Sequence, residues 1–197
     1  MLNASMLTYM PELTTPRLRL RRLTMRDAQD IYRYSRDPEV ARHVLWDAHR
    51  TIGDSRAYLR FMLRRYRFQE PASWGIEYLE TGHVIGTIGF MWVQDENAAA
   101  EVGYSLSREY WNRGIMTEAL SAVIRYGFDG MDLNRIEAQH ETTNPASGAV
   151  MRKCGMRMEG TLRQRLYNKG HFVDVALYAI LRGDYRQRIA DGTLYSP

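Results

Sequence analysis

The chain has 197 residues, of which 45% are apolar and 25% are charged. This length and composition fit one domain with an ordered core and argue against a disordered chain. Lysine and arginine together number 27 and aspartate and glutamate 23, so the net positive charge is small. The sequence pI of about 9.3 is the only feature that suggests a nucleic-acid partner. The single cysteine, Cys154, excludes an internal disulfide and a multi-cysteine zinc site, and we expect no metal centre.

Nothing in the sequence predicts a membrane anchor. The longest stretch without a charged residue, residues 81–94, contains three glycines. It is shorter than the ~20 apolar residues that a membrane-spanning helix needs. The first eleven residues contain no lysine or arginine, whereas a secretory leader begins with positive charge. We therefore expect a cytoplasmic protein with no membrane partner.

The first part of the chain is predicted to form one strand and three helices. After a lead-in over residues 1–14, polar and apolar residues alternate from Arg17 to Arg21, as in a strand with one buried face. Thr24 is a typical helix cap, and Pro38 suits the first turn of a second helix. Apolar residues at helical spacing between Tyr58 and Tyr66 predict a third helix over residues 54–68.

The remainder of the chain alternates predicted strands with two helices. Residues 74–79 and 84–93 read as strands joined by a tight turn, followed by a strand at 100–106, a helix at 114–128 and a strand at 135–140. Asn144-Pro145 begins another helix, which Gly155 ends. Two last strands, 156–166 and 172–181, flank Asn168-Lys-Gly170, a typical hairpin turn.

This order predicts a mixed α/β (α+β) fold around one central sheet. The sheet is expected to be mainly antiparallel, with helix crossovers on either side of the 135–140 strand. We place a single domain over residues 15–186, between the lead-in 1–14 and a C-terminal tail 187–197.

The segment from Glu101 to Leu120 is the most informative for function. A strand ends, a short loop with Gly114 follows, and a helix begins with Ile115, Met116 and Thr117. The first turn of a helix presents free N–H groups and a partial positive charge, which with Arg113 beside it suits a pyrophosphate. From these residues alone an ordinary strand-to-helix connection is the better explanation, because no phosphate-loop or dinucleotide fingerprint is present.

A second segment makes the pattern specific. Glu101-Val-Gly-Tyr-Ser-Leu106 and Trp111-Asn-Arg-Gly-Ile-Met-Thr-Glu-Ala119 are followed by Asn144-Pro-Ala-Ser147 and then Gly155-Met156. Together these blocks resemble the GNAT acetyltransferases, and within them the ribosomal-protein N-terminal acetyltransferases of the RimJ/RimL branch. That branch has the pattern E-[IV]-G-Y-x-L, W-x-x-G-x-x-T-E-A and N-x-x-S followed by G-F. The resemblance covers residues 16–185.

The resemblance implies that the cosubstrate is acetyl-CoA. Its pyrophosphate would bind the backbone from Arg113 through Gly114, Ile115 and Met116 to Thr117. Its pantetheine arm would lie between the 100–106 and 135–140 strands, which splay apart in the family, and unpaired strand groups suit this peptide-like arm. Tyr104, Ser105 and Leu106 would contact the thioester, and Asn144 and Ser147 would also contact the cosubstrate. Met116, Trp111 and Met156 depart from residues common in the wider superfamily, but none abolishes a backbone-mediated site.

The resemblance also assigns catalytic roles. Many members protonate the leaving thiolate with a tyrosine where this chain has Met151, and in the N-x-x-S branch the serine, here Ser147, takes over. Ser147 could instead only cap its helix. Glu101 occupies a strand position where many members place the base, although a solvent-facing strand glutamate is an equal alternative. Related ribosomal enzymes place a base where this chain has Leu166. His140 and Glu141 are therefore the reserve candidates for the base.

We therefore expect an N-acetyltransferase in which an amine attacks acetyl-CoA directly in a ternary complex. The acceptor is a protein N-terminal amine on the branch resemblance, and a polyamine, amino acid or antibiotic is the alternative. A protein that binds acyl-CoA without turnover is a third interpretation. No specific nucleic-acid partner is expected, and a homodimer is left open.

Overall fold

The computed structural model describes residues 10–193. Within that range one sheet of eight strands runs in the order β1-β2-β3-β4-β5-β6-β8-β7. Neighbours pair antiparallel except β5 and β6, which are parallel, so the predicted mixed α/β class is confirmed. The strands are β1 (Leu13–Thr14), β2 (Leu18–Arg21), β3 (Ser73–Tyr78), β4 (His83–Gln94), β5 (Ala99–Leu106), β6 (Arg135–Glu141), β7 (Arg157–Asn168) and β8 (His171–Leu181).

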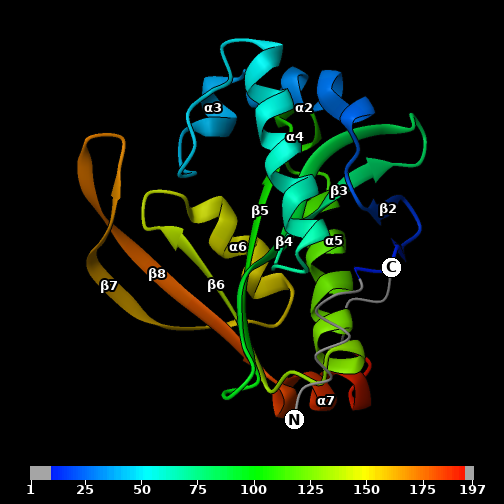
Figure 1. The fold of residues 1–197 in the computed structure, drawn as a ribbon. Coiled ribbons are helices and arrows are strands. Elements are labelled where there is room, and N and C mark those ends of the chain that lie inside the picture. Colours follow the sequence, from blue (N-terminus) through cyan, green and yellow to red (C-terminus); the bar gives the residue numbers. More distant parts are fainter. Residues whose placement is uncertain (1–9, 194–197) are drawn as a thin grey trace.

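Helices cover both faces of the sheet (Figure 1). Trp74 and Ile76 share one core cluster with α5 and α6, while Gly75 between them faces Leu23, which belongs to the cluster of α2 and α4. Since successive residues of a strand point to opposite faces, the two helix pairs lie on opposite sides. The helical segments are η1 (Met25–Asp27), α2 (Ala28–Ser35), α3 (Pro38–Ala41), α4 (Ile52–Arg67), η2 (Arg108–Tyr110), α5 (Ile115–Arg125), the π-helical η3 (Tyr126–Gly130), α6 (Pro145–Lys153) and α7 (Arg182–Ala190).

The local signals read from the sequence account for most element ends. Thr24 forms a capping box with Asp27, and Asp37 caps α3 with Pro38 in its first turn. The β7–β8 hairpin turns through Lys169 and Gly170, both with φ in the left-handed region (47° and 87°). This is the conformation that a two-residue hairpin turn of this kind requires, and glycine adopts it at low cost.

Two segments near the chain ends differ from expectation. Leu13 and Thr14, placed in the lead-in, pair with β2. Helix α7 was not predicted, and it continues to Ala190, beyond the expected start of the tail at residue 187. Its mostly polar sequence gives little periodic signal, but Tyr185 buries its ring against Phe128 at 4.8 Å and donates its hydroxyl to Asp129. Packing by a single aromatic residue thus holds a helix that periodicity does not reveal.

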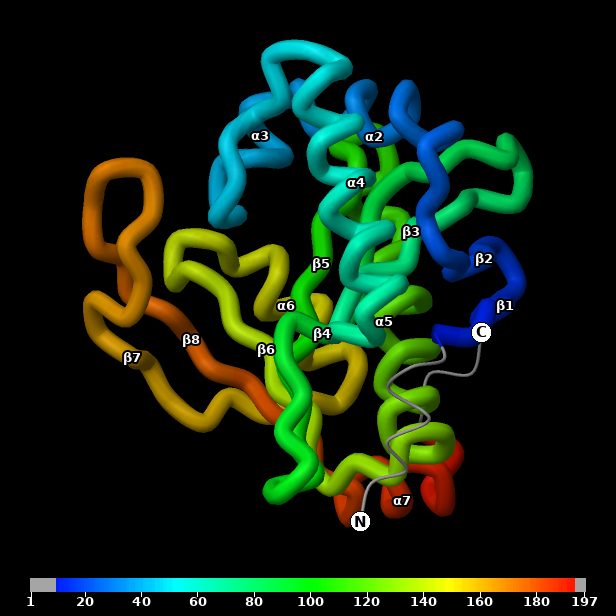
Figure 2. The backbone as a smooth tube through the Cα atoms, in the orientation of Figure 1, coloured from blue at the N-terminus to red at the C-terminus, as the bar shows by residue number. Residues whose placement is uncertain are grey.

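The parallel strands β5 and β6 separate part-way along their length. Their pairing runs from Ala99 and Arg135 to Glu101 and Glu137. Beyond that point β5 stays paired with β4 as far as Leu106, and β6 stays paired with β8 as far as Glu141. Figures 1 and 2 show the two strands diverging from this point. The expected splayed pair is therefore confirmed, and it positions the site described next. No helix of the described residues is long and apolar enough to cross a membrane.

Candidate active site

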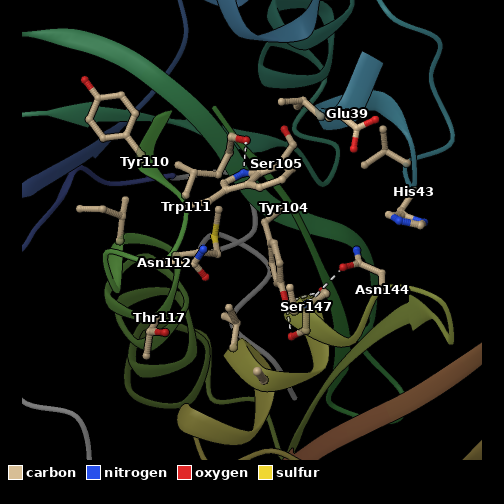
Figure 3. Close-up of a pocket in the computed structure, with 18 of the residues that line it drawn as sticks. Glu39, His43, Tyr104, Ser105, Tyr110, Trp111, Asn112, Thr117, Asn144 and Ser147 are labelled. Atoms are coloured by element: carbon tan, nitrogen blue, oxygen red, sulfur yellow. Dashed lines mark hydrogen bonds between the residues drawn. The ribbon is translucent and has the colours of Figure 1, made fainter. Parts of the chain in front are cut away.

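A cavity of about 430 Å³ opens at the end of β5 (Figure 3). Its walls come from the end of β5, the loop and first turn of α5, the first turns of α6, and the segment that contains α3. This volume lies in the range of small-molecule sites. Among the residues predicted for the site, those lining the cavity are Tyr104, Ser105, Leu106, Gly114, Ile115, Met116, Thr117, Asn144 and Ser147.

Two predicted site residues lie outside this lining. The Glu101 carboxylate accepts hydrogen bonds from Trp92 Nε1 at 2.8 Å and from Gln139 Nε2 at 3.0 Å, so it links β4, β5 and β6 where the strands separate. The Arg113 guanidinium lies over the Tyr110 ring, 5.5 Å from the ring centre. The backbone carbonyl of Arg113 accepts a hydrogen bond from the Arg17 guanidinium. The structure thus gives Glu101 a structural link and does not bring its side chain into the cavity.

The loop before α5 is shaped by contacts that the sequence shows only in part. Trp111 folds back so that its Nε1 donates to the Leu106 carbonyl at 2.9 Å. Asn112 and Gly114 both adopt the left-handed region, with φ of 60° and 73°. A Cβ on Gly114 would meet only Arg17 Nη2, at 3.6 Å. The helix start therefore faces the cavity with its first backbone N–H groups, which have no intrahelical partners.

Helix α5 is anchored in place by a buried carboxylate. Glu118, 2% exposed, accepts hydrogen bonds from Thr15 Oγ1 at 2.6 Å and from the Arg17 backbone N–H at 3.0 Å. The Arg17 guanidinium pairs with its other oxygen at 2.7 Å. The N-terminal strand region is thereby tied to the first turn of α5. The negative charge of Glu118 is neutralised, so the positive end of the helix is preserved for an anion.

A hydroxyl pair lies on the opposite wall of the cavity. Tyr104 of β5 reaches α6, where its hydroxyl oxygen is 2.8 Å from Ser147 Oγ, and it also donates to the Ser147 carbonyl at 3.2 Å (Figure 3). Burial raises the pKa of Tyr104 well above its ordinary value, and the contact with Ser147 only partly offsets this. Asn144 caps α6 through its side-chain oxygen, which accepts the Ser147 N–H. Met151, one turn further along, is 1% exposed and belongs to the core.

Residues of the α3 segment also line the cavity, and no motif in the sequence indicates them. They are Glu39, Val40, Arg42, His43 and Val44. His43 Nδ1 lies 2.7 Å from the carboxylate of Glu141, the reserve residue at the end of β6. The other reserve, His140, donates from Nδ1 to the Glu141 carbonyl and packs its ring against Tyr178. No local pattern announces this contact, because His43 and Glu141 are far apart in the sequence.

The geometry fits a coenzyme A thioester. The strand divergence leaves an edge of β5 for a peptide-like arm, and the α5 start offers N–H groups to a pyrophosphate. Of the side chains, only Arg17 approaches the space beside Gly114, with Nη2 3.6 Å from where a Cβ would lie. The hydroxyl of Ser147 lies on the same cavity. These features define a fold and site of the acyl-CoA-dependent acyltransferase kind.

Comparison with known proteins agrees with this class. Residues 17–157 match the model of the acetyltransferase (GNAT) domain. The uncharacterized N-acetyltransferase YoaA of Bacillus subtilis is 35% identical over 172 residues, covering 87% of this chain and 97% of that protein. The crystal structure of a GNAT-family acetyltransferase from Bacillus anthracis superposes with a TM-score of 0.79 at 26% identity, covering 88% of this chain and 99% of that one. The Escherichia coli ribosomal-protein-serine acetyltransferase is 33% identical over 96 residues, 49% of this chain and 54% of that protein.

The chain belongs to the GNAT acetyltransferase family. It is an enzyme of the N-acetyltransferase class.

Proposed function

We propose that this enzyme acetylates a protein N-terminal amine by direct attack of the amine on acetyl-CoA in a ternary complex. The observation that carries the direct-transfer part is the single cavity in which the β5 edge, the α5 start and the Tyr104–Ser147 pair meet. The protein acceptor is supported by relatives named for ribosomal-protein substrates, among them the E. coli ribosomal-protein-serine acetyltransferase.

The backbone of Gly114, Ile115, Met116 and Thr117 would hold the pyrophosphate, since these residues line the cavity and the first turn of a helix has N–H groups without intrahelical partners. Bound acetyl-CoA supplies an activated acyl group and a thiol leaving group. The β5 backbone between Tyr104 and Leu106 would polarise the thioester carbonyl, a contribution worth about 2.7–4 kcal/mol per donor where it has been measured.

Ser147 would donate its proton to the leaving thiolate. Tyr104 holds the Ser147 hydroxyl from the β5 side, and the Asn144 cap fixes the first turn that carries it. The buried thiol of Cys154 takes no part, because burial raises its pKa to about 11 and its Sγ donates to the Thr117 carbonyl. The proposed reaction passes through no covalent enzyme intermediate.

Glu101 stays a prediction as a base. Both its oxygens accept hydrogen bonds from neighbouring strands, so it would act only through a water between it and the amine. The Glu101→Gln variant keeps the contact with Trp92 and removes the charge, and its turnover measures this role.

The experiment is a measurement of thiol release from acetyl-CoA with a panel of amines. The panel holds peptides with free N-termini, the same peptides with blocked N-termini, polyamines, amino acids and aminoglycosides, and mass spectrometry locates the acetyl group. We expect release only with free-N-terminal peptides. Preference for a small amine would replace the acceptor class, and CoA binding without release from any amine would contradict the catalytic proposal.

A further inference from the structure

His43 is held at the cavity wall by a carboxylate from another part of the sheet. It follows α3 and lines the cavity together with Asn144 and Ser147 (Figure 3). Its Nδ1 lies 2.7 Å from Glu141 Oε2, and Glu141 is 8% exposed. A carboxylate only accepts, so Nδ1 is the donor in this contact. In the neutral ring the lone pair then resides on Nε2.

Glu141 is itself fixed from a third segment. Its Oε1 accepts the side-chain N–H of Asn168 at 2.5 Å, at the end of β7. Burial acts to raise the pKa of Glu141, but the hydrogen bonds from His43 and Asn168 outweigh it and the pKa is lowered. Glu141 therefore stays ionised at neutral pH, and its hydrogen bond with His43 Nδ1 is charge-assisted.

The chain after His43 is also restrained. Lys169, in the turn of the β7–β8 hairpin, donates from Nζ to the carbonyls of Val44 at 2.8 Å and Trp46 at 3.1 Å. The His43 ring is thus positioned from β6 through Glu141, while the backbone that follows His43 is held from the hairpin. A carboxylate that orients a histidine ring whose second nitrogen is left available is the arrangement of a positioned general base.

We propose that His43 is the catalytic residue that accepts the proton of the acceptor amine, and that Glu141 is its positioning residue. The assignment deepens the proposed function and rests on it. An acceptor arriving as an ammonium ion gives one proton to His43 Nε2, and the freed lone pair forms the C–N bond while the C–S bond breaks. The second amine proton passes to Ser147 Oγ as Ser147 protonates the sulfur, and His43 then returns its proton to solvent.

The test compares two variants with one control. His43→Gln keeps a side-chain amide that can contact Glu141 but accepts no proton. We expect kcat to fall about 10²–10⁴-fold with unchanged CoA affinity by calorimetry, and the acidic limb of the kcat/KM pH profile to disappear. The control is His83→Gln, because His83 Nδ1 also lies against a carboxylate, Asp30 at 3.1 Å, but outside the cavity lining. It should leave the rate and the pH profile unchanged.

Glu141→Gln tests the positioning role. Loss of the carboxylate removes the group that orients the His43 ring, so kcat should fall, though less than in His43→Gln, while KM for the amine stays unchanged. The other charged groups near the pair are Glu39 of α3 and Arg42 just after it, which line the same cavity, and Lys169 and His171 from the hairpin, and both variants retain them.

The outcomes separate the two claims. Full turnover and an intact acidic limb in His43→Gln, with the variant folded and binding CoA, overturn the assignment of His43 alone. Loss of the limb in Glu101→Gln instead would move the base to Glu101. If no amine in the panel makes the wild-type enzyme release CoA, the proposed function is overturned, and the assignment of His43 falls with it.

Discussion

The hydroxyl groups of Tyr104 and Ser147 are 2.8 Å apart and share one wall of the cavity. Ser147→Ala removes the proposed donor to the thiolate, so we expect kcat to fall about 10²-fold or more with little change in CoA affinity. Tyr104→Phe removes only the group that orients Ser147, and its effect should be smaller.

The double variant distinguishes these roles. If Tyr104 acts through Ser147, the two losses are not additive, with an interaction energy of about 0.5–3 kcal/mol. Ser121→Ala is the control, because that hydroxyl contacts Cys154 and lies outside the cavity lining. Additive losses would mean that Tyr104 does not act through Ser147. A Ser147→Ala variant that loses only CoA affinity would make Ser147 a binding residue.

Gly114 offers a second prediction at the level of one residue. With φ of 73°, a valine there is strained by about 1–2 kcal/mol and also places methyl groups where backbone N–H groups approach the pyrophosphate. Gly82 in the β3–β4 turn has φ of 69° and open space around it, so Gly82→Val carries the same strain away from the cavity. Both variants should lose similar stability in urea unfolding, but only Gly114→Val should lose CoA affinity in calorimetry.

The residues of the site were predictable to the extent that they lie in local motifs. Gly114, Asn144 and Ser147 stand at helix starts, where the reason for each residue type is readable from its neighbours. Glu101 also stands in a motif, but its partners Trp92 and Gln139 come from adjacent strands, and only the fold shows that they engage both carboxylate oxygens. His43 belongs to no motif and reaches the site through a long-range contact.

At the level of elements, the buried Glu118 connects the N-terminal strands to α5. Arg17→Met would leave this carboxylate buried without its cation, close to the proposed pyrophosphate site. We expect a loss of at least about 1–3 kcal/mol in unfolding free energy, together with weaker CoA binding through repulsion between like charges. Chemical denaturation and calorimetry measure the two effects.

The matched variant is Arg17→Met combined with Glu118→Leu, which removes the buried charge as well. Part of both losses should be regained, since replacing a buried ion pair by apolar residues is often close to neutral. Continued weak binding in the double variant would show that Arg17 itself contacts the phosphate.

Elements with strong local signals were predicted well, and those held by packing were not. The Asn168–Gly170 turn and the capped helix starts are determined by backbone conformation, so their residues announce them. Helix α7 is held by Tyr185 and leaves no periodic pattern in the sequence. The helix predicted over residues 114–128 was found, but its last turn is π-helical, where Gly127 packs closely on Ile136.

For the molecule as a whole, acid should be destabilising. In Asp27 and Glu141, burial acts to raise the pKa, but hydrogen bonds outweigh it and the pKa is lowered, at Asp27 through Arg21 and Thr24. The unfolded chain, with carboxyl pKa values near ~4, then binds more protons than the folded one as the pH drops below about 5. Unfolding free energy should therefore decrease from that pH downward.

Urea denaturation at a series of pH values measures this effect. Asp27→Asn should be less stable at neutral pH and should show a weaker dependence on acid. Asp47→Asn is the control, because the Asp47 side chain is 90% exposed. An equal acid dependence in the wild type and Asp27→Asn would assign the effect to other groups.

The fold class followed from the order of elements, while the shape of the cavity required the folded chain. The splayed strands were expected from the family resemblance, and the register shows where pairing stops. The wall formed by residues 39–44 brings the N-terminal half over the end of β6, and this depends on long-range packing.

The short ladder between β5 and β6 has a mechanical consequence. Strands β1 to β5 form one part of the sheet and β6 to β8 the other. Within the described residues, the ladder that joins the two parts is only three residue pairs long. The pantetheine arm of a thioester bound in the gap would extend this ladder with its own amide groups and so hold the two parts of the sheet together. The sheet should then be most rigid with the cosubstrate bound and least rigid after the arm has left. Cosubstrate binding and product release would each change the rigidity of the sheet.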